Sequence, residues 1–479
     1  MSAILTQLAD SLTRQFGPQV AEQTLPVAEA WLSGNTAVAR AQLGPIEAAL
    51  EAGALIHSGD FVYLERSHQQ ESGLAQDLLA RAKVTDLSAE QNEALQAIAA
   101  AQTHPLNPGQ LSAIDLAVRS HFGLLLGGPG TGKSTVIRAL VQAYLSLIKP
   151  TGRVALSAPT GKAAARLAGL VPDVQPTTLA RLEQQLRQQV WFDLVIVDEA
   201  SMVDLASAER LLARLPQQTR LIWVGDPNQL DSVEPGSILG ELARAKRLAP
   251  VRRALSETYR FDAATPLGQL AQGALAGQPG TLAQHWDEHG LSCSDLLAHS
   301  IAQHRARLGQ GLEHQRPVLT QYQLLCATRI GPWGSEQCNA RIHQQLVEEG
   351  LIAQQPGDGW IIMVTRNQPA LGLANGDVGI IDQGDLVIGE RRVPLHLVPF
   401  WEMAWAISVH KSQGSEYDEV GLMLGQHAGQ QGRSRALVYT GITRAKQRVW
   451  IGGELGDLQA AVANVSTRAS GLADLIEQA

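Results

Sequence analysis

Hydrophobic and polar positions change their spacing several times along the 479-residue chain. Up to about residue 105, Ala, Leu and Gln recur at helical spacing, and a short strand-like run, GDFVYL, interrupts them at residues 59–64. Pro105 marks a boundary, because a proline disfavours helix in the residue before it. We therefore predict a mostly helical N-terminal module over residues 1–105.

Beyond residue 105, short apolar runs alternate with longer stretches of helical spacing. Asn107 can cap a helix that has Pro108 in its first turn, and the apolar run FGLLL follows that helix. The strand-like runs VALSAP, LVIVDE and LIWVGD are separated by helical stretches such as STVIRALVQAYLSLI and LASAERLLARL. This alternation is typical of a parallel sheet covered by helices, so we predict an α/β domain over residues 106–250.

The same alternation returns later in the chain. The strand-like runs YQLLCAT, EVGLML and RVWIGG predict a second α/β domain over residues 251–344 and 401–479. Residues 345–400 differ, because IIMVTRN, GDVGIID and DLVIGERRVPLHLVP give short strands broken by Gly and Pro. We predict a β-rich insertion there, in a chain of the α/β class with two parallel sheets.

Composition narrows the class of protein. With 45% hydrophobic and 18% charged residues, the chain resembles soluble globular proteins, and no apolar run approaches the roughly 18 residues of a membrane span. The first residues lack the basic start and long apolar stretch of a secretory signal, so we expect a cytoplasmic protein without a membrane partner. The 3 cysteines have no CxxC spacing, which argues against a zinc site or a disulfide framework.

Charge is distributed unevenly. The net charge of −8 is not that of a typical nucleic-acid-binding protein, but affinity for phosphates depends on local potential. Residues 420–453 contain no acidic residue, which indicates either a solvated basic face or a phosphate-binding one. The cations of this segment are Arg433, Arg435, Arg444, Lys446 and Arg448.

The segment GGPGTGKST has the spacing of a phosphate-binding loop, between a predicted strand and a predicted helix. Glycines let the backbone N–H groups wrap a phosphate closely, so the segment predicts an ATP site with Mg²⁺. We expect Lys133 to hold the β- and γ-phosphates and Ser134 to hold the metal ion. The predicted ATP-binding residues of the loop are Gly127, Gly128, Pro129, Gly130, Thr131, Gly132, Lys133, Ser134 and Thr135.

A second acidic signal follows the buried run LVIV. Asp198 and Glu199 come directly after it, and strands of an open α/β sheet deliver such residues to the ligand crevice. Asp198 is predicted to hold the metal ion and Glu199 to activate the attacking water. Two acids after a strand can also serve as a helix N-cap, but the loop upstream favours the catalytic interpretation.

The remaining motifs resemble those of superfamily 1 helicases in order and spacing, over nearly everything after residue 105. LNPGQ, LSAPTGKAAARLA, GDPNQLDSVEPG, LSETYRF, AISVHKSQGSEYDEV and VYTGITRAK carry this resemblance. It implies two RecA-like motor domains and a catalytic set that adds Gln229, a γ-phosphate sensor, and the arginine fingers Arg260 and Arg444. It also implies adenine contact by Gln110, ribose contact by Glu416, and DNA contact by Thr160, Lys162, Thr178, Arg181, His410, Lys411 and Gln413.

The chain departs from the usual helicase pattern at several positions. Residues 177–181 read TTLAR where the family usually has Thr-Ile-His-Arg, so a histidine contact is missing. Asp231 stands where proline is common, and Gly441 stands where alanine is common. Trp333, in a Gly-Pro-Trp-Gly turn, is a candidate for stacking on a base, whereas Trp223 and Trp405 are predicted to be core residues.

A narrower resemblance is to the RecD family, the alpha subunits of bacterial RecBCD (exonuclease V) complexes. QYQLLCATRIGPWGSEQCNARI, TRNQPALGLANGDVGI, EMAWAISVHKSQGSEYD and FVYLERSHQQE carry it. It implies an ATP-driven superfamily 1B helicase that moves 5′ to 3′ on single-stranded DNA at duplex ends, with RecB- and RecC-like partners and an SH3-like insertion. No nuclease carboxylate cluster is evident, so nuclease activity would belong to partners.

Three alternatives to that function remain open from the sequence. One is a freestanding RecD-like helicase without partners. Another is a structural subunit with a vestigial ATPase, although the chain retains the motif residues named above. The third is an RNA motor, because strand-tracking motors grip the backbone and a preference for the 2′-OH is not visible here.

The resemblance also implies a β-hairpin pin, between the motifs around Thr160 and Asp198, that splits the duplex. Here the segment EQQLRQQVW, residues 183–191, is all that separates Leu182 from the next strand. It has no Gly, Pro, Asn or Asp to supply the left-handed turn residues of a tight hairpin. We predict a helix that continues from Leu179 and hence a reduced pin.

Overall fold

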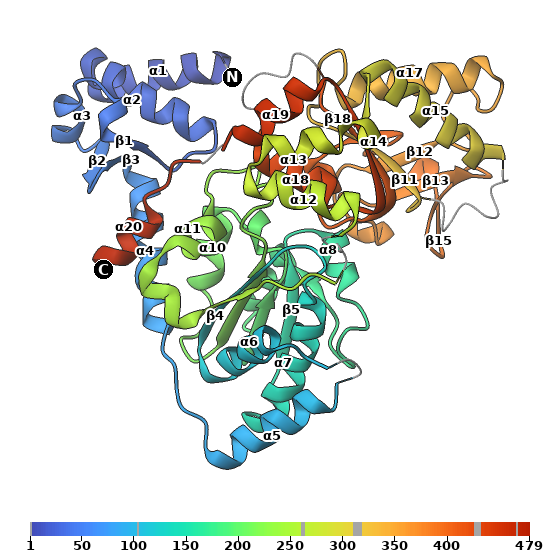
Figure 1. The fold of residues 1–479 in the computed structure, drawn as a ribbon. Helices are drawn as coiled ribbons and strands as arrows, with labels where there is room; N and C mark the ends of the chain where they lie inside the picture. Colours follow the sequence, from blue (N-terminus) through green and yellow to red (C-terminus); the bar gives the residue numbers. More distant parts are fainter. Residues whose placement is uncertain (1, 103–104, 260–263, 310–318, 426–432, 466–467) are drawn as a thin grey trace.

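The computed structural model describes residues 2–102, 105–259, 264–309, 319–425, 433–465 and 468–479. Within them the strands form four sheets, two of which are parallel. Figure 1 shows the small N-terminal sheet to one side, one parallel sheet in the lower part and the other in the upper part of the view. The α/β class expected from the alternation is confirmed. No described helix has the length and apolar character needed to cross a bilayer.

The N-terminal segment is helical around one small sheet. The strand-like run at residues 59–64 forms the second half of a hairpin, whose turn uses Gly59 at φ 56. The sheet order is β1-β3-β2, and all pairs are antiparallel. The elements are α1(Ser2–Phe16), α2(Pro18–Leu32), β1(Ala37–Ala39), η1(Arg40–Gln42), α3(Glu47–Glu51), β2(Leu55–Ser58), β3(Phe61–Leu64), α4(Glu65–Arg81) and α5(Ala89–Ala100).

The first parallel sheet, here called the P-loop sheet, has the order β6-β5-β7-β8-β4-β9. Its long strands are buried apolar runs, as expected for a sheet covered on both faces. Its strands are β4(Phe122–Gly127), β5(Val154–Ala158), β6(Thr177–Thr178), β7(Leu194–Val197), β8(Arg220–Gly225) and β9(Arg252–Leu255).

Helices cover both faces of the P-loop sheet. Side chains alternate along β4: Leu124 packs with α4, α9, α10 and α11, while Leu125 packs with α5, α6 and α7. The covering elements and turns are α6(Pro108–Arg119), α7(Lys133–Leu147), α8(Gly161–Arg166), α9(Leu179–Arg187), η2(Ala200–Met202), α10(Leu205–Leu212), α11(Ile238–Arg244) and η3(Lys246–Val251).

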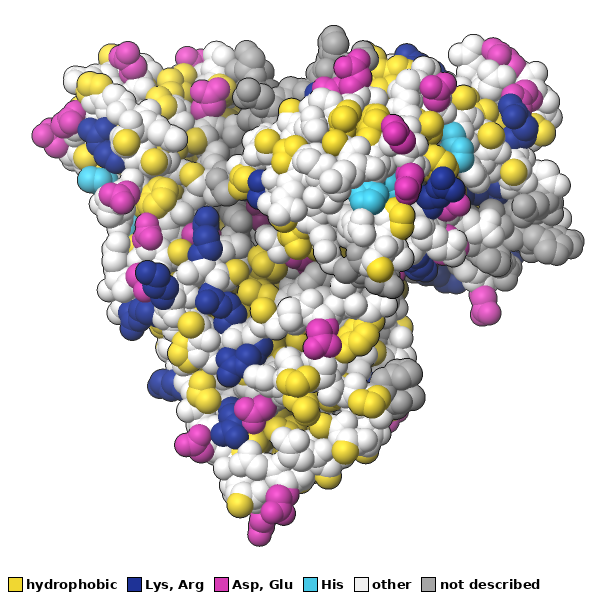
Figure 2. All heavy atoms as spheres, in the orientation of Figure 1, with side chains coloured by type: hydrophobic (Ala, Val, Ile, Leu, Met, Phe, Trp, Pro, Cys, Tyr) yellow, Lys and Arg dark blue, Asp and Glu magenta, His cyan; other side chains and the backbone are white. Residues whose placement is uncertain are grey.

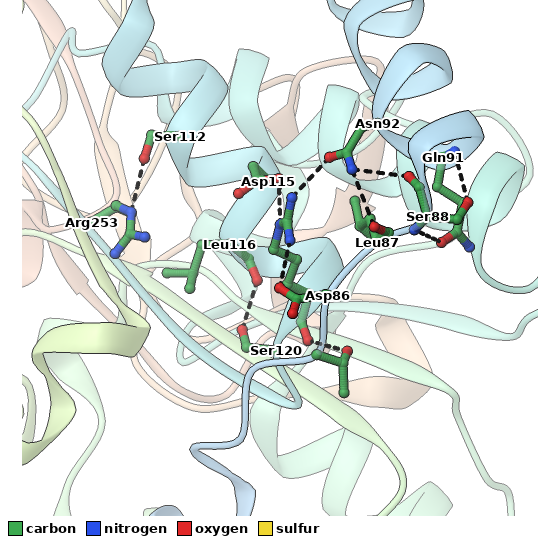
Figure 3. Close-up of polar contacts among 12 residues, drawn as sticks. Asp86, Leu87, Ser88, Gln91, Asn92, Ser112, Asp115, Leu116, Ser120 and Arg253 are labelled. Carbon is green, nitrogen blue, oxygen red and sulfur yellow. Dashed lines mark hydrogen bonds and ion pairs between the residues drawn. The ribbon is translucent and has the colours of Figure 1, made fainter.

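The helix α5 belongs with this sheet rather than with the N-terminal module where we expected it. Leu95 is buried in the same cluster as α6 and α7, and Arg119 of α6 donates to Asn92 Oδ1 at 2.8 Å. Figure 3 shows Asn92 and Asp115 on either side of this junction, with Ser88 beside Asn92. The strand β9 likewise extends the P-loop sheet to Leu255, beyond the expected boundary at residue 250. Helical spacing could not reveal which sheet an amphipathic helix covers.

The second parallel sheet has the order β10-β19-β18-β11-β17. Its core includes Trp405, which is fully buried, and Trp223 is fully buried in the P-loop sheet, so both core predictions are confirmed. Its strands and helices are α12(Pro266–Ala276), α13(Pro279–Gln284), α14(Trp286–His289), β10(Gly290–Leu291), α15(Cys293–Gly309), β11(Tyr322–Cys326), α17(Ser335–Glu348), β17(Ala406–Ser408), η7(His410–Ser412), β18(Tyr417–Met423), α18(Arg435–Ile442), β19(Ala445–Gly452) and α19(Leu455–Ala463).

The last helix, α20(Leu472–Gln478), leaves that sheet. We expected residues up to 479 in the second α/β domain, but Leu472 and Ile476 are buried against α4 and α11 beside the P-loop sheet. Figure 1 shows α20 next to α4 and the N-terminal strands. Apolar residues on one face of a short helix predict burial but not the surface that buries them.

The β-rich insertion is an antiparallel sheet with the order β15-β14-β13-β12-β16. It begins at Ile361 and ends at Met403, later than the expected 345–400, because α17 continues to Glu348. An SH3-like closure of this sheet stays a prediction. The elements are β12(Ile361–Val364), η5(Pro369–Leu371), β13(Val378–Asp382), β14(Asp385–Ile388), β15(Arg391–Pro394), η6(Leu395–Leu397) and β16(Trp401–Met403).

The segment where a pin would lie is helical. α9 starts at Leu179, ends at Arg187 and buries Leu182 and Leu186 in the P-loop core. A single turn then leads to β7, with Gln189 at φ 61. The predicted helix in place of a hairpin is therefore present between β6 and β7.

Candidate ATP site and nucleic-acid face

The phosphate-binding loop lies between β4 and α7. Gly130 and Gly132 have φ values of 78 and 81, a left-handed region that favours glycine. The Lys133 Nζ atom folds back over the loop and donates to the carbonyl oxygens of Gly127 and Gly128 at 2.8 and 3.0 Å. The loop is thus closed around its own lysine, and a phosphate would exchange these carbonyl contacts for phosphate oxygens.

A cavity of about 520 Å³ opens beside this loop, and residues from both parallel sheets line it. Gly127, Gly128 and Thr131 line a second cavity instead. Pro105, Arg166 and Tyr259, which no sequence motif assigned to the nucleotide, also line the first cavity. The predicted residues in its lining are Gln110, Pro129, Gly130, Gly132, Lys133, Ser134, Thr135, Asp198, Glu199, Gln229, Glu416 and Arg444.

Asp198 and Glu199 stand at the end of β7 on the wall of this cavity. Burial, together with the neighbouring Glu199 charge, raises the pKa of Asp198 to about 6, while Lys133 and Arg166 oppose that shift. Among the side-chain atoms that the structure describes, the shielded Asp198 Oδ1 has no hydrogen-bond partner. An unpaired carboxylate oxygen in a cavity that Ser134 also lines fits a hard divalent cation such as Mg²⁺.

Two side chains from opposite sides of the cavity bond directly. Arg444, after α18, donates from Nη2 to Oε1 of Gln229 at 3.0 Å, and Gln229 donates to Asp226 Oδ2 at 3.2 Å. A backbone group also joins the two sides, because the N–H of Leu230 donates to Thr440 Oγ1 at 2.9 Å. The predicted γ-phosphate sensor and arginine finger are therefore one hydrogen-bonded unit between the two parallel sheets.

Gln110 is buried at the cavity wall. Its Oε1 accepts from Asn107 N at 3.1 Å as part of a capping box, and its Nε2 donates to Thr131 O at 3.3 Å. Beside it, Tyr259 is 62% exposed and is held by a bond from its own N–H to Gly130 O. An exposed aromatic ring next to a glutamine amide suits a flat heterocycle. Arg260, the other predicted finger, lies outside the described residues.

On the P-loop side, the predicted DNA contacts follow adjacent strands. Thr160 caps α8 after β5, and Thr178 caps α9 at the end of β6, each through its hydroxyl oxygen. Arg181 is exposed on α9, and the Lys162 Nζ atom lies 5.8 Å from the Tyr417 ring centroid. In Figure 2, Lys and Arg side chains gather along the left side of the lower half of the visible face, where the P-loop sheet and its helices lie.

On the other side, the predicted DNA contacts separate. Lys411 is exposed and pairs with Glu402, and His410 is half-buried, with its pKa lowered by burial and by Arg468. Gln413 is buried and donates to Leu230 O at 2.8 Å, so its amide joins the two sheets in this structure. Its contact with DNA stays a prediction.

Trp333 also differs from its expected role. The guanidinium of Arg341 lies 4.8 Å from its ring centroid, and the ring packs against the core of the second sheet. One face of the indole is therefore covered, which does not favour base stacking there.

Comparison with known proteins agrees with this geometry. Family models described as an AAA domain and as a UvrD-like helicase C-terminal domain match residues 105–293 and 403–451. The RecBCD enzyme subunit RecD of Mycolicibacterium smegmatis is 32% identical over 466 residues, or 86% of this chain and 82% of that protein. The chain belongs to the RecD family.

Two other similarities are more limited. The ATP-dependent RecD2 DNA helicase of Deinococcus radiodurans is 33% identical over 381 residues, which are 75% of this chain and 50% of that protein. A crystal structure of Bacteroides Pif1 bound to ssDNA is 15% identical with a TM-score of 0.47, and the match covers 74% of this chain and 94% of that one. The domain matches and the family membership assign this RecD-family chain to the ATP-dependent helicases.

The structure gives reasons for two departures of this RecD-family chain from the usual helicase pattern. A Cβ atom on Gly441 would lie 2.7 Å from Leu422 Cδ1, so a glycine lets α18 approach β18 closely. Asp231 accepts from Ser237 Oγ at 2.8 Å, and burial raises its pKa. Both residues therefore have local partners in the fold, and neither lines the ATP cavity.

Proposed function

We propose that this RecD-family chain is an ATP-driven motor that moves 5′ to 3′ on single-stranded DNA. The supporting observation is the shared cavity: Lys133, Asp198 and Glu199 reach it from the P-loop sheet, while Glu416 and Arg444 reach it from the second sheet. A nucleotide held between two such units couples hydrolysis to their closure and opening. Alternate gripping and release of a strand is then translocation.

The proposed roles of the chain's own groups in the hydrolytic step are as follows. Glu199 takes a proton from a water molecule whose oxygen bonds to the γ-phosphorus, while the bond from that phosphorus to the ADP oxygen breaks. Lys133 and Arg444 place positive charge where negative charge spreads in the transition state. Mg²⁺, held by Ser134 and Asp198, would neutralise part of the phosphate charge when bound.

The test is Lys133→Ala, with ATP turnover measured with and without single-stranded DNA. We expect ATP turnover to be abolished and DNA binding to be retained, because Lys133 is expected to bind the phosphates while the candidate DNA contacts lie elsewhere. Unchanged turnover in the variant would remove the motor assignment. Parallel assays with single-stranded RNA separate a DNA motor from an RNA motor.

We infer further that the chain acts as the alpha subunit of a cytoplasmic complex for double-strand-break repair, beside RecB- and RecC-like partners that supply the nuclease. The match to a RecD subunit spans most of both proteins, whereas the match to RecD2 spans half of RecD2. Affinity purification of the native protein with identification of its companions tests this role. A lone monomer would favour a freestanding helicase.

A further inference from the structure

The short helix α8 is packed between the two parallel sheets. A Cβ atom on Gly161 would lie 2.4 Å from the Cβ of Ala374, in a loop of the β-rich insertion, so the two backbones meet there. One residue further, the Lys162 ammonium faces the Tyr417 ring of the second sheet. α8 belongs to the P-loop sheet by sequence, but one of its faces is the boundary with the other motor unit.

The last residue of α8 spans the ATP cavity. Arg166 donates from Nη2 to Oε1 of Glu416 at 2.6 Å, and its Nη1 lies 3.5 Å from Oε1 of Glu199. The side chain of Arg166 is 42% exposed, whereas those of Glu199 and Glu416 are 11% and 17% exposed. One guanidinium therefore joins a carboxylate from each motor unit.

This contact differs from an ordinary surface ion pair. Ion pairs that are exposed to solvent contribute little to stability, because water screens both charges. Here both carboxylates are largely shielded, and without the cation they would face each other across the cleft as like charges. Among the described residues, the other charged groups that line this cavity are Lys133, Asp198 and Arg444.

The two ends of α8 have different neighbours. Thr160 and Lys162, both candidate DNA contacts, stand at its beginning, and Arg166 stands at its end. A helix of six residues is about 9 Å long, so a shift of its first turn is transmitted directly to its last residue. The helix thus connects the nucleic-acid face to the carboxylate that is to activate water.

We propose that Arg166 is a positioning residue that restrains Glu199 in the absence of DNA and releases it when DNA binds along the first turn of α8. The proposal rests on the function inferred above. The ion pair holds the Glu199 carboxylate toward Arg166 and away from a water that would attack phosphate, so the bridge keeps hydrolysis slow until a strand is bound. Displacement of α8 breaks the bridge to Glu416 and frees Glu199.

The experiment compares Arg166→Gln, Arg166→Lys and the control Arg214→Ala. Arg214 belongs to the same unit, lies just after α10 and does not line the ATP cavity. For each, kcat and KM for ATP are measured with and without saturating oligo(dT). Arg166→Gln should raise kcat without DNA by roughly tenfold, which corresponds to an activation free energy lower by about 1.4 kcal/mol. The factor by which DNA stimulates kcat should fall by the same tenfold. KM should hardly change, and Arg166→Lys should keep the low basal rate.

Other outcomes are equally informative. A loss of kcat with and without DNA, or a raised KM, would make Arg166 a contact to the nucleotide and overturn the restraint. Unchanged stimulation by DNA would also overturn it. None of these results touches the motor assignment, which depends on the Lys133 variant. Nucleotide binding and circular dichroism of Arg166→Gln verify that the variant is folded.

Discussion

The guanidinium of Arg444 donates to the side-chain oxygen of Gln229, with Nη2 and Oε1 3.0 Å apart. The same arginine donates to the backbone oxygens of Thr440 and Ser415, so its position is fixed by its own unit. Gln229 in turn bonds to Asp226 at the end of β8. Arg444 can therefore reach the ATP cavity only while the two parallel sheets stay as close together as they are in this structure.

Replacing Arg444 with Ala should leave nucleotide binding nearly intact and lower turnover by roughly 10³-fold, the usual scale for an arginine finger. The reason is that its charge is needed where the transition state gains negative charge. Nucleotide affinity and single-turnover hydrolysis measure the two effects. Arg448→Ala, an exposed position on the next strand, should keep full turnover. Equal losses of binding and turnover would indicate a ground-state contact instead.

The helix α9 leads to a second expectation, about strand separation. Without a hairpin between β6 and β7, the isolated chain should translocate on single strands with good ATPase but unwind duplex poorly. Streptavidin displacement from a biotinylated single strand, set against unwinding of a 5′-tailed duplex, measures the two activities. Efficient unwinding by the chain alone would show that another element splits the duplex, and Trp191→Ala would test the exposed ring that follows α9.

Glu71 predicts a pH dependence of stability. It is buried, accepts from Thr36 Oγ1 and Ser470 Oγ, and burial raises its pKa from 4.5 to about 7. The folded state therefore favours the protonated acid, and its contribution to stability is present below pH 4.5 and lost as the pH rises through about 7. The shift corresponds to roughly 3 kcal/mol.

Glu71→Gln, which cannot ionise, should flatten this profile. Melting temperatures of both proteins between pH 4.5 and 8 supply the comparison, and their difference isolates Glu71 from other carboxylates. We expect the variant to gain stability relative to the wild type as the pH rises. A difference that stays constant over this range would mean that Glu71 does not change its protonation on unfolding.

Local signals in the sequence predicted the nucleotide side of the site well. Asp198 follows a buried strand directly, and Lys133 begins the helix after the loop that follows another, so their places in the sheet bring them to one cavity. Arg166 was missed because an arginine on a short polar helix usually faces solvent, and its partner Glu416 is 250 positions away in the sequence. Gln413 was assigned to DNA because its motif carries that role, but the burial of its amide depends on how two sheets meet.

The boundaries of the structural units were also difficult to predict. α5 and α20 have apolar faces that any sheet could cover, and their actual partners are distant in sequence. β9 is short, and its pairing with β4 depends on the position of a strand about 130 residues earlier. Periodicity therefore predicted the helices and strands, whereas packing between residues distant in sequence determined which structural unit each of them joins.

The packing of α20 against α4 and α11 changes how the second parallel sheet is connected to the rest of the molecule. The chain leaves the P-loop sheet after Leu255 and returns to it at Leu472, so the second motor unit is an insertion with both ends anchored on the first. A unit joined to its neighbour at two points is held more closely than one joined at a single point, and a rotation about the line through both points is the motion that such a connection opposes least. Closure on ATP should therefore resemble the turning of a hinge more than a translation.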